Sequence, residues 1–210
     1  MPTSTDTFGL ALRDSAAEFG IQVDADDVKR LSDYYQLVRK WNERLHLVAP
    51  CPPEEFATRH VLESLMLLQH LPQNARVVDV GSGAGLPIIP CLIMRADLRA
   101  TLIESSRRKA VFLREALRDV NSREPARLSV ARFEQTTAPE ADFVTCRALD
   151  RFREFLPALI EWAPLASTLL LFAGEALRRQ IEILLPLARA ERIPRSDRRF
   201  LIVGSQASAV

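Results

Sequence analysis

Cysteine and lysine are both scarce in this chain of 210 residues. The three cysteines, Cys51, Cys91 and Cys146, are odd in number and form no CxxC pair or Cys/His cluster. This pattern argues against a disulfide scaffold and against a structural zinc site, and it fits a reducing cytosol. We therefore expect a protein without a bound metal.

Long apolar runs are missing as well. The N-terminal stretch MPTSTDTFGLALRDS is polar and lacks the apolar core of a secretory signal. The longest apolar stretches elsewhere are too short or too charged to span a bilayer. We expect a soluble, cytoplasmic protein that has no membrane partner and acts as a monomer.

The charge is nearly balanced, with a formal net charge of +1 at pH 7. Bulk charge therefore neither indicates nor excludes a nucleic-acid partner, because a basic patch can lie on a neutral protein. Only Lys29, Lys40 and Lys109 are lysine, so arginine supplies nearly all the positive charge. The planar guanidinium suits phosphate groups and guanine edges, although genome composition produces the same bias and is the favoured explanation.

The first 70 residues have the periodicity of helices. Gly20 suits the C-terminal cap of a first helix. In the second helix, within DADDVKRLSDYYQLVRKWNERLHLV, the aromatic residues share one stripe with leucines. Tyr34, Tyr35 and Trp41 are therefore predicted to pack in the core and not to stack on bases. A third helix over residues 54–71 is predicted to end at Pro72.

From residue 75 onward, short apolar runs alternate with helical segments, which indicates parallel βαβ units. The predicted strands are 76–80, 100–104, 127–130, 142–146, 168–172, 189–193 and 200–203, and the predicted helices are 86–94, 107–120, 151–162 and 174–187. The last two strands leave no room for a helix between them and predict a closing antiparallel pair. We predict an N-terminal helical extension, residues 1–72, packed on a mostly parallel, doubly wound α/β domain, residues 73–210.

The run VVDVGSGAGLP places three of the seven glycines directly after the first predicted strand. Gly81, Gly83 and Gly85 lack a Cβ and tolerate positive φ, so the backbone can approach a ligand there. The GxGxG spacing differs from the dinucleotide and P-loop patterns and disfavours a dehydrogenase. Asp79 suits a positively charged group, and Glu104, which ends the second strand, suits ribose hydroxyls. The pattern is typical of Rossmann-like methyltransferases that use S-adenosyl-L-methionine (SAM), and a tight turn without a ligand is the alternative.

Five blocks spread over nearly the whole chain resemble one family. KWNERLHLV resembles KWNxxxNLT, RHVLESL resembles RHxLDSL, DVGSGAGLPIIP resembles DVGTGxGxPGIP, LIESSRRKAVFLREA resembles LLDSxxKRxxFLRxV, and CRAL resembles SRAx. These patterns belong to the bacterial small-subunit ribosomal RNA methyltransferase G family, also called glucose-inhibited division protein B. The resemblance implies transfer of a methyl group from SAM to N7 of one guanine in 16S rRNA. That nitrogen needs no deprotonation, which agrees with the absence of an evident catalytic triad in the sequence.

The resemblance also implies site residues. Beside Glu104, already assigned from its place at the end of a strand, those for the cofactor are Gly81, Gly83, Gly85, Leu86, Phe133, Glu134 and Arg147. Phe133 and Glu134 follow the third strand, where the family contacts adenine, although an isolated Phe133 would be read as a core aromatic. Arg147 is the first candidate for a catalytic residue, acting by positioning near the reacting centre. It is expected at the mouth of the cleft, where it would hold the cofactor carboxylate or an RNA phosphate. A surface arginine is the alternative.

RNA contacts are expected from Arg59, His60, Arg107, Arg108 and Lys109. The last three open a helix, and a solvated helix face is the favoured alternative for them. His60 could equally hold the extension over the cofactor cleft. His70 is expected to be exposed at a helix end.

Several positions depart from the family pattern. They are His46 and Val48 for Asn and Thr, Glu63 for Asp, Ile88 for Gly, Cys146 for Ser, and Ala173 for Lys. Ile88 is expected to crowd the approach to the glycine loop, and Ala173 removes a charge. These departures keep two alternatives open: a methyltransferase acting on a small molecule or protein, and a SAM-binding module without catalysis.

Overall fold

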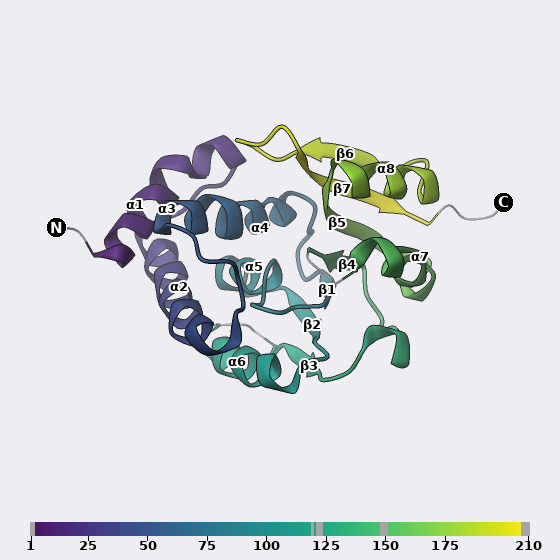
Figure 1. Ribbon diagram of the computed structural model, residues 1–210, viewed down its shortest axis with the longest axis horizontal. Helices are drawn as coiled ribbons and strands as arrows, with labels where there is room; N and C mark the ends of the chain where they lie inside the picture. Colours follow the sequence, from purple (N-terminus) through teal and green to yellow (C-terminus); the bar gives the residue numbers. More distant parts are fainter. Residues whose placement is uncertain (1–2, 119, 121–123, 148–150, 207–210) are drawn as a thin grey trace.

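The computed structural model describes residues 3–118, 120, 124–147 and 151–206. Its centre is a seven-stranded sheet with the order β3-β2-β1-β4-β5-β7-β6 (Figure 1). The strands are β1 Arg76–Val80, β2 Arg99–Ile103, β3 Arg127–Ser129, β4 Phe143–Cys146, β5 Thr168–Gly174, β6 Arg189–Arg192 and β7 Arg199–Ser205. Strands β1 to β5 are parallel, whereas β7 is antiparallel to both β5 and β6. The predicted doubly wound sheet with a closing antiparallel pair is confirmed.

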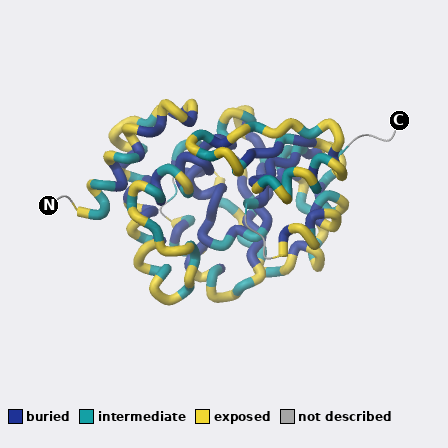
Figure 2. Tube along the Cα trace, turned by 45° about the horizontal axis from the view of Figure 1, so that its top comes forward, coloured by how far each residue is buried: buried dark blue, intermediate teal, exposed yellow. Residues whose placement is uncertain are grey.

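Helices cover both faces of the sheet because its strands alternate side chains between two apolar cores. Val77 of β1 belongs to the first core, while Val78 and Val80 belong to the second. The first core packs α5 (Ile88–Met94), α6 (Arg107–Arg118) and the N-terminal extension, and the second packs α7 (Phe152–Trp162) and α8 (Glu175–Leu184). Figure 2 shows the buried residues concentrated along the central strands. The end of the predicted helix 107–120 lies partly outside the described residues.

The N-terminal extension begins with two helices whose starts are capped by their own sequence. Helix α1 (Ser4–Ala16) has a capping box between Thr3 and Asp6, and α2 (Ala25–Leu45) has one between Asp24 and Asp27. Each box satisfies backbone N–H groups that would otherwise lack partners. Gly20 adopts the left-handed conformation at the end of the short η1 (Ala17–Phe19), as predicted.

The predicted third helix is helical but not uniform. It consists of α3 (Pro53–Glu55), a π-helix η2 (Phe56–Leu62), α4 (Glu63–Leu65) and η3 (Met66–Gln69). Single π-helical turns inside longer helices are frequent at functional sites. Here the π-helix faces the carboxyl end of β4 and supplies carbonyl groups to Arg147.

The aromatic residues of α2 pack inside the protein as predicted. Tyr34 and Tyr35 are 5 % and 3 % exposed, and Trp41 packs against the ring of Phe112 on α6. The first core runs without a break from the extension into the sheet, and the division at residue 72 remains a prediction. The predicted exposure of His70 is wrong, because its Nε2 lies 3.0 Å from a carboxylate oxygen of Glu191 on β6 and the ring is largely covered.

Candidate cofactor site

The glycine loop that follows β1 has the conformation that its sequence demands. Gly81, Gly83 and Gly85 all have positive φ, at 73°, 53° and 79°. A Cβ on Gly85 would lie 2.2 Å from Cδ1 of Ile89, so this position needs glycine for space as well as for conformation. The loop can therefore turn sharply while its backbone stays accessible at the carboxyl end of β1.

Glu104, directly after β2, holds this loop from one side. Its Oε2 accepts a hydrogen bond from the backbone N–H of Gly83 at 2.8 Å, and its Oε1 accepts one from Ser106 at 2.7 Å. A carboxylate offers about four acceptor positions, so two of them remain for a ligand. The side chain is thus fixed by two backbone groups and still able to accept bonds from hydroxyls.

Two adjoining cavities open beside the glycine loop. The larger one, called here the loop cavity, has a volume of about 440 Å³. It is lined by Leu47, Val48, Ala49, His60, Gly81, Ser82, Gly83, Ala84, Leu86, Glu104, Ser105, Ser106, Lys109 and Arg147. The smaller one, of about 150 Å³, is lined by Val80, Gly81, Ile103, Ser105, Ala131, Arg132, Phe133, Glu134 and Phe155. Because Gly81 and Ser105 line both, the cavities form one groove across the ends of β1, β2 and β3.

The structure thus gathers most of the cofactor residues expected from the sequence around this groove. Gly85 is the exception: it lines neither cavity and lies against Ile89, whose backbone N–H donates to its carbonyl at 2.7 Å. Phe133 is 3 % exposed and contacts the rings of Phe155 and Trp162 edge-on. It therefore belongs to the second core and also forms a wall of the smaller cavity.

Tyr34 is a contributor that the sequence did not reveal. Its hydroxyl, carried by α2 in the extension, donates a buried hydrogen bond of 2.7 Å to the carbonyl of Ala84 in the glycine loop. The helical stripe predicted that Tyr34 is buried, but a partner 50 residues away can only be found once α2 lies against α5. The loop is therefore held at Gly83 by Glu104 and at Ala84 by the extension.

Arg147 lines the loop cavity, but its guanidinium is turned toward the extension. Nη1 donates to the carbonyl of His60 and to Oγ of Ser64, both at 3.0 Å, and Nη2 donates to the carbonyl of Arg59. Nη2 also lies 3.3 Å from Glu63. In this conformation both Nη atoms already donate to groups of the protein, so the expected contact of Arg147 with a cofactor carboxylate or an RNA phosphate stays a prediction that needs another rotamer. The side chain instead locks the π-helix onto β4.

Two titratable groups around Arg147, Glu63 and His60, have unusual environments. Glu63, whose side chain is 4 % exposed, pairs with Arg147 and also with Arg199 of β7. Its burial raises the pKa of this carboxyl, against the opposing effect of both guanidinium groups. Burial lowers the pKa of His60 to about 3, and the positive charge of Arg147 acts in the same direction. His60 is therefore neutral near pH 7 and a weak base.

Asp79 does not reach the groove. It is fully buried in β1, lines neither cavity, and neither carboxylate oxygen has a hydrogen-bond partner in the described part of the chain. Burial raises its pKa to about 7. The expectation that Asp79 faces a positively charged group in the site is not met by this geometry.

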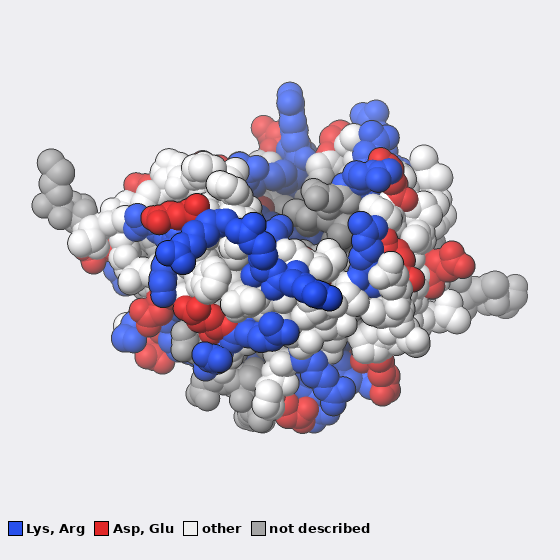
Figure 3. Space-filling view, turned by 60° about the horizontal axis from the view of Figure 1, so that its bottom comes forward, with Lys and Arg blue, Asp and Glu red and all other residues white. Residues whose placement is uncertain are grey.

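The residues expected to touch RNA are divided between the cavity and the surface. His60 and Lys109 line the loop cavity, whereas Arg59, Arg107 and Arg108 are exposed outside it. Arg108 donates to the carbonyl of Arg44 at 3.3 Å and so joins the start of α6 to the end of α2. Figure 3 shows Lys and Arg side chains gathered across the face of the molecule that lies at the bottom of Figure 1.

The departures from the family pattern mostly spare the groove. Ile88 is fully buried in the first core and lines neither cavity, so the expected crowding of the loop is wrong. Ala173 is 5 % exposed in the second core. His46 ends α2 in the left-handed conformation (φ 47°), which histidine, like asparagine, adopts more readily than most residues. Part of the CRAL block, Ala148 and Leu149, lies outside the described residues.

The groove fits SAM for two reasons. The glycine turn lets the backbone approach a ligand closely, and the carboxylate of Glu104, fixed beside the turn, can accept hydrogen bonds from ribose hydroxyls. The sheet order, the glycine loop and this acid together define the class of SAM-dependent methyltransferases with a Rossmann-like fold. Within this class, the model of the GidB family, rRNA small subunit methyltransferase G, matches residues 27–189. The chain belongs to that family.

Individual relatives agree with this assignment. The chain is 42 % identical over 129 residues to ribosomal RNA small subunit methyltransferase G of Xanthomonas campestris pv. campestris (strain B100), which covers 61 % of this chain and 60 % of the relative. The same protein of Neisseria meningitidis serogroup C is 33 % identical over 145 residues, covering 69 % and 70 %. The match thus spans less than two thirds of the first relative's length.

The fold also matches a solved structure, the magnesium protoporphyrin IX methyltransferase of Synechocystis PCC 6803 with bound SAM. The TM-score is 0.59, over 89 % of this chain and 99 % of that chain. At 14 % identity, this likeness concerns the fold alone. In the described part of the chain, no helix is both long and apolar enough to cross a membrane.

Proposed function

We propose that this protein transfers a methyl group from SAM to N7 of a guanine in 16S rRNA of the small ribosomal subunit. The observation that carries the proposal is the groove at the ends of β1, β2 and β3, built on a glycine loop and Glu104 in a chain of the GidB family. Exposed basic residues at the start of α6 and the end of α2 lie next to this groove and suit a phosphate backbone.

In this proposal the described residues divide the binding of SAM among them. Gly81, Gly83 and Leu86 border the loop cavity and would enclose the methionine part, while Glu104 would accept bonds from the ribose hydroxyls. Phe133 and Glu134 would form the adenine wall in the smaller cavity. When bound, SAM supplies a methyl group on a positively charged sulfur.

The protein then has to position the guanine and exclude water, since the N7 lone pair needs no general base. The lining of the loop cavity agrees with this requirement. His60, the histidine in that lining, is neutral and weakly basic because its pKa is about 3. Arg147 acts as a positioning residue that holds the π-helix, and with it the wall of the cavity, against the sheet.

The test is methyl transfer in vitro from labelled SAM to 30S subunits, naked 16S rRNA and 50S subunits in parallel. We expect labelled 7-methylguanine at one position of 16S rRNA and none in 50S subunits. Gly85→Val, which forces a side chain against Ile89 at positive φ, serves as the inactive control. Transfer to small molecules or protein, with no label in 16S rRNA, contradicts the proposal and favours the alternative substrate classes.

We also propose that the protein works as a monomer in the cytoplasm. The support for the cytoplasm is the proposed substrate, because ribosomal subunits are cytoplasmic. The support for the monomer is that the residues proposed to bind SAM, on both cavities of the groove, can all come from a single copy of the chain. Light scattering in the presence and absence of SAM tests the monomer, and a stable dimer under both conditions contradicts it.

A further inference from the structure

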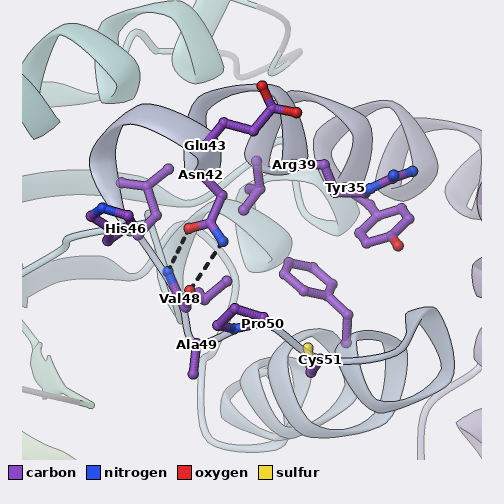
Figure 4. A pocket seen from close by; sticks show the side chains of 12 residues that line it. Tyr35, Arg39, Asn42, Glu43, His46, Val48, Ala49, Pro50 and Cys51 are labelled. Carbon is purple, nitrogen blue, oxygen red and sulfur yellow. Dashed lines mark hydrogen bonds between the residues drawn. The ribbon is translucent and has the colours of Figure 1, made fainter.

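A pocket of about 630 Å³ lies within the N-terminal extension, outside the groove described above (Figure 4). We call it the extension pocket. Its floor is apolar and consists of Tyr35, Val38 and Phe56, none of which is more than 3 % exposed. The other residues that line it are Arg39, Asn42, Glu43, His46, Leu47, Val48, Ala49, Pro50 and Cys51. An apolar floor with a few polar groups at the rim is the usual form of a ligand site.

One wall of this pocket is shared with the loop cavity. Leu47, Val48 and Ala49 line both. The side chain of Asn42 donates to the carbonyl of Val48 at 3.0 Å and accepts from its N–H at 2.9 Å, so the wall is held in place (Figure 4). A group seated in the extension pocket therefore lies directly across a three-residue partition from the groove.

The rim of the pocket carries one positive and one negative side chain, Arg39 and Glu43, which together are complementary to the edge of a nucleobase. Arg39 lies over the ring of Tyr35, with its Cζ 5.7 Å from the ring centre, and Glu43 stands one helical turn further along α2. Arginine and carboxylate side chains are complementary to the acceptors and donors on base edges. Across the partition, Lys109 lines the loop cavity, so positive charge lies on both sides.

We propose that the extension pocket holds one unstacked base of the substrate RNA, next to the base that enters the loop cavity. The inference rests on the proposed function and adds a second contact to it. RNA is recognised in large part through bases that leave their stack and lie against protein side chains. Two departures from the family pattern, His46 and Val48, line this pocket. Because His46 does not line the loop cavity, whereas Val48 lies in the shared wall, we expect His46 to affect which base is accepted and not how SAM binds.

Cys51 provides a direct probe, because it lines the pocket and is partly exposed, whereas Cys91 and Cys146 are fully buried. N-ethylmaleimide should therefore modify only Cys51 in the folded protein. The rate is measured by mass spectrometry for the protein alone, with S-adenosylhomocysteine, and with 30S subunits in an excess shown by cosedimentation to bind it. We expect 30S subunits to slow the reaction about tenfold and S-adenosylhomocysteine alone to leave it unchanged. An unchanged rate in the bound complex, or protection by S-adenosylhomocysteine alone, overturns the inference.

A pair of matched variants tests the rim. Arg39→Ala is expected to raise the Kd for 30S subunits about fivefold to tenfold and to leave the Kd for S-adenosylhomocysteine unchanged. Arg179→Ala, on the exposed face of α8, removes the same charge elsewhere and should change neither. Equal effects of the two variants contradict a specific pocket. A wild-type protein that methylates 16S rRNA but gives no protection of Cys51 refutes only this inference, whereas one that neither binds nor methylates it refutes the proposed function as well.

Discussion

The substitution Tyr34→Phe removes a single hydroxyl group and leaves the carbonyl of Ala84 without its buried donor. Loss of one partner of a buried hydrogen bond costs about 1–3 kcal/mol, because the remaining group is neither bonded nor solvated. The carbonyl belongs to the glycine loop and directly follows Gly83, whose N–H is held by Glu104. We therefore expect part of the cost to appear in the affinity for the cofactor.

If the loss of this hydrogen bond weakens the binding free energy of S-adenosylhomocysteine by about 1 kcal/mol, its Kd rises about fivefold. Isothermal titration calorimetry measures this change, and thermal unfolding measured separately reports the loss of stability. Tyr35→Phe is the matched control: its hydroxyl is bonded to Oγ of Ser4 at 3.0 Å, and its ring stacks on Phe8. It removes the same atom from the next residue of the same helix.

The reasoning predicts that Tyr34→Phe weakens binding while Tyr35→Phe does not. It would be refuted by a Tyr34→Phe protein that binds S-adenosylhomocysteine as tightly as the wild type, even if the melting temperature falls. Equal weakening by both variants would also refute it, since the extension would then act through general stability and not through the carbonyl of Ala84.

Four further outcomes follow from the same contacts. Glu104→Gln removes a charged acceptor and places an amide donor against a backbone N–H. The Kd for S-adenosylhomocysteine, measured by calorimetry, should therefore rise about 10–100-fold. An unchanged Kd contradicts the proposal that Glu104 binds the ribose hydroxyls. Gly85→Ala, at φ 79° against Ile89, should lower the free energy of unfolding by about 1–3 kcal/mol in urea titrations, and a neutral effect would show that the loop adapts freely. In the folded protein the pKa of His60 is about 3, below its ordinary value, so the unfolded state binds the proton first. The free energy of unfolding should therefore decrease as pH falls from about 6.5 toward 3. His60→Gln should make that decrease smaller. The pKa of Asp79 is shifted upward, to about 7, so the folded state holds its proton longer than the unfolded state and the free energy of unfolding decreases as pH rises from about 4 through 7. Asp79→Asn should therefore stabilise the protein mainly above pH 7. An equal stabilisation at pH 4 contradicts a buried charge.

Local patterns in the sequence determined the sheet and the nature of the site. The alternation of apolar runs with helical segments is a pattern of residues close together in the sequence. The strands and the closing antiparallel pair could therefore be predicted from it. Three glycines within five residues permit positive φ and a close backbone approach, and Glu104 at the end of the next strand lies beside them because β1 and β2 are parallel neighbours. These residues could therefore be assigned to one site without knowledge of the tertiary structure.

Only the tertiary structure decided what surrounds that site. The helical stripe of α2 predicts that Tyr34 is buried, but its bond to Ala84 depends on how α2 packs on α5. Arg147 follows a strand, and its side chain could equally have faced solvent. In the structure its guanidinium donates hydrogen bonds to carbonyl groups of the π-helix beside it. Asp79 and Ile88, which the sequence places near the loop, point away from the groove into buried positions. Such contacts join residues tens of positions apart, and their partners are set by the packing of whole elements, which no local pattern of residues encodes.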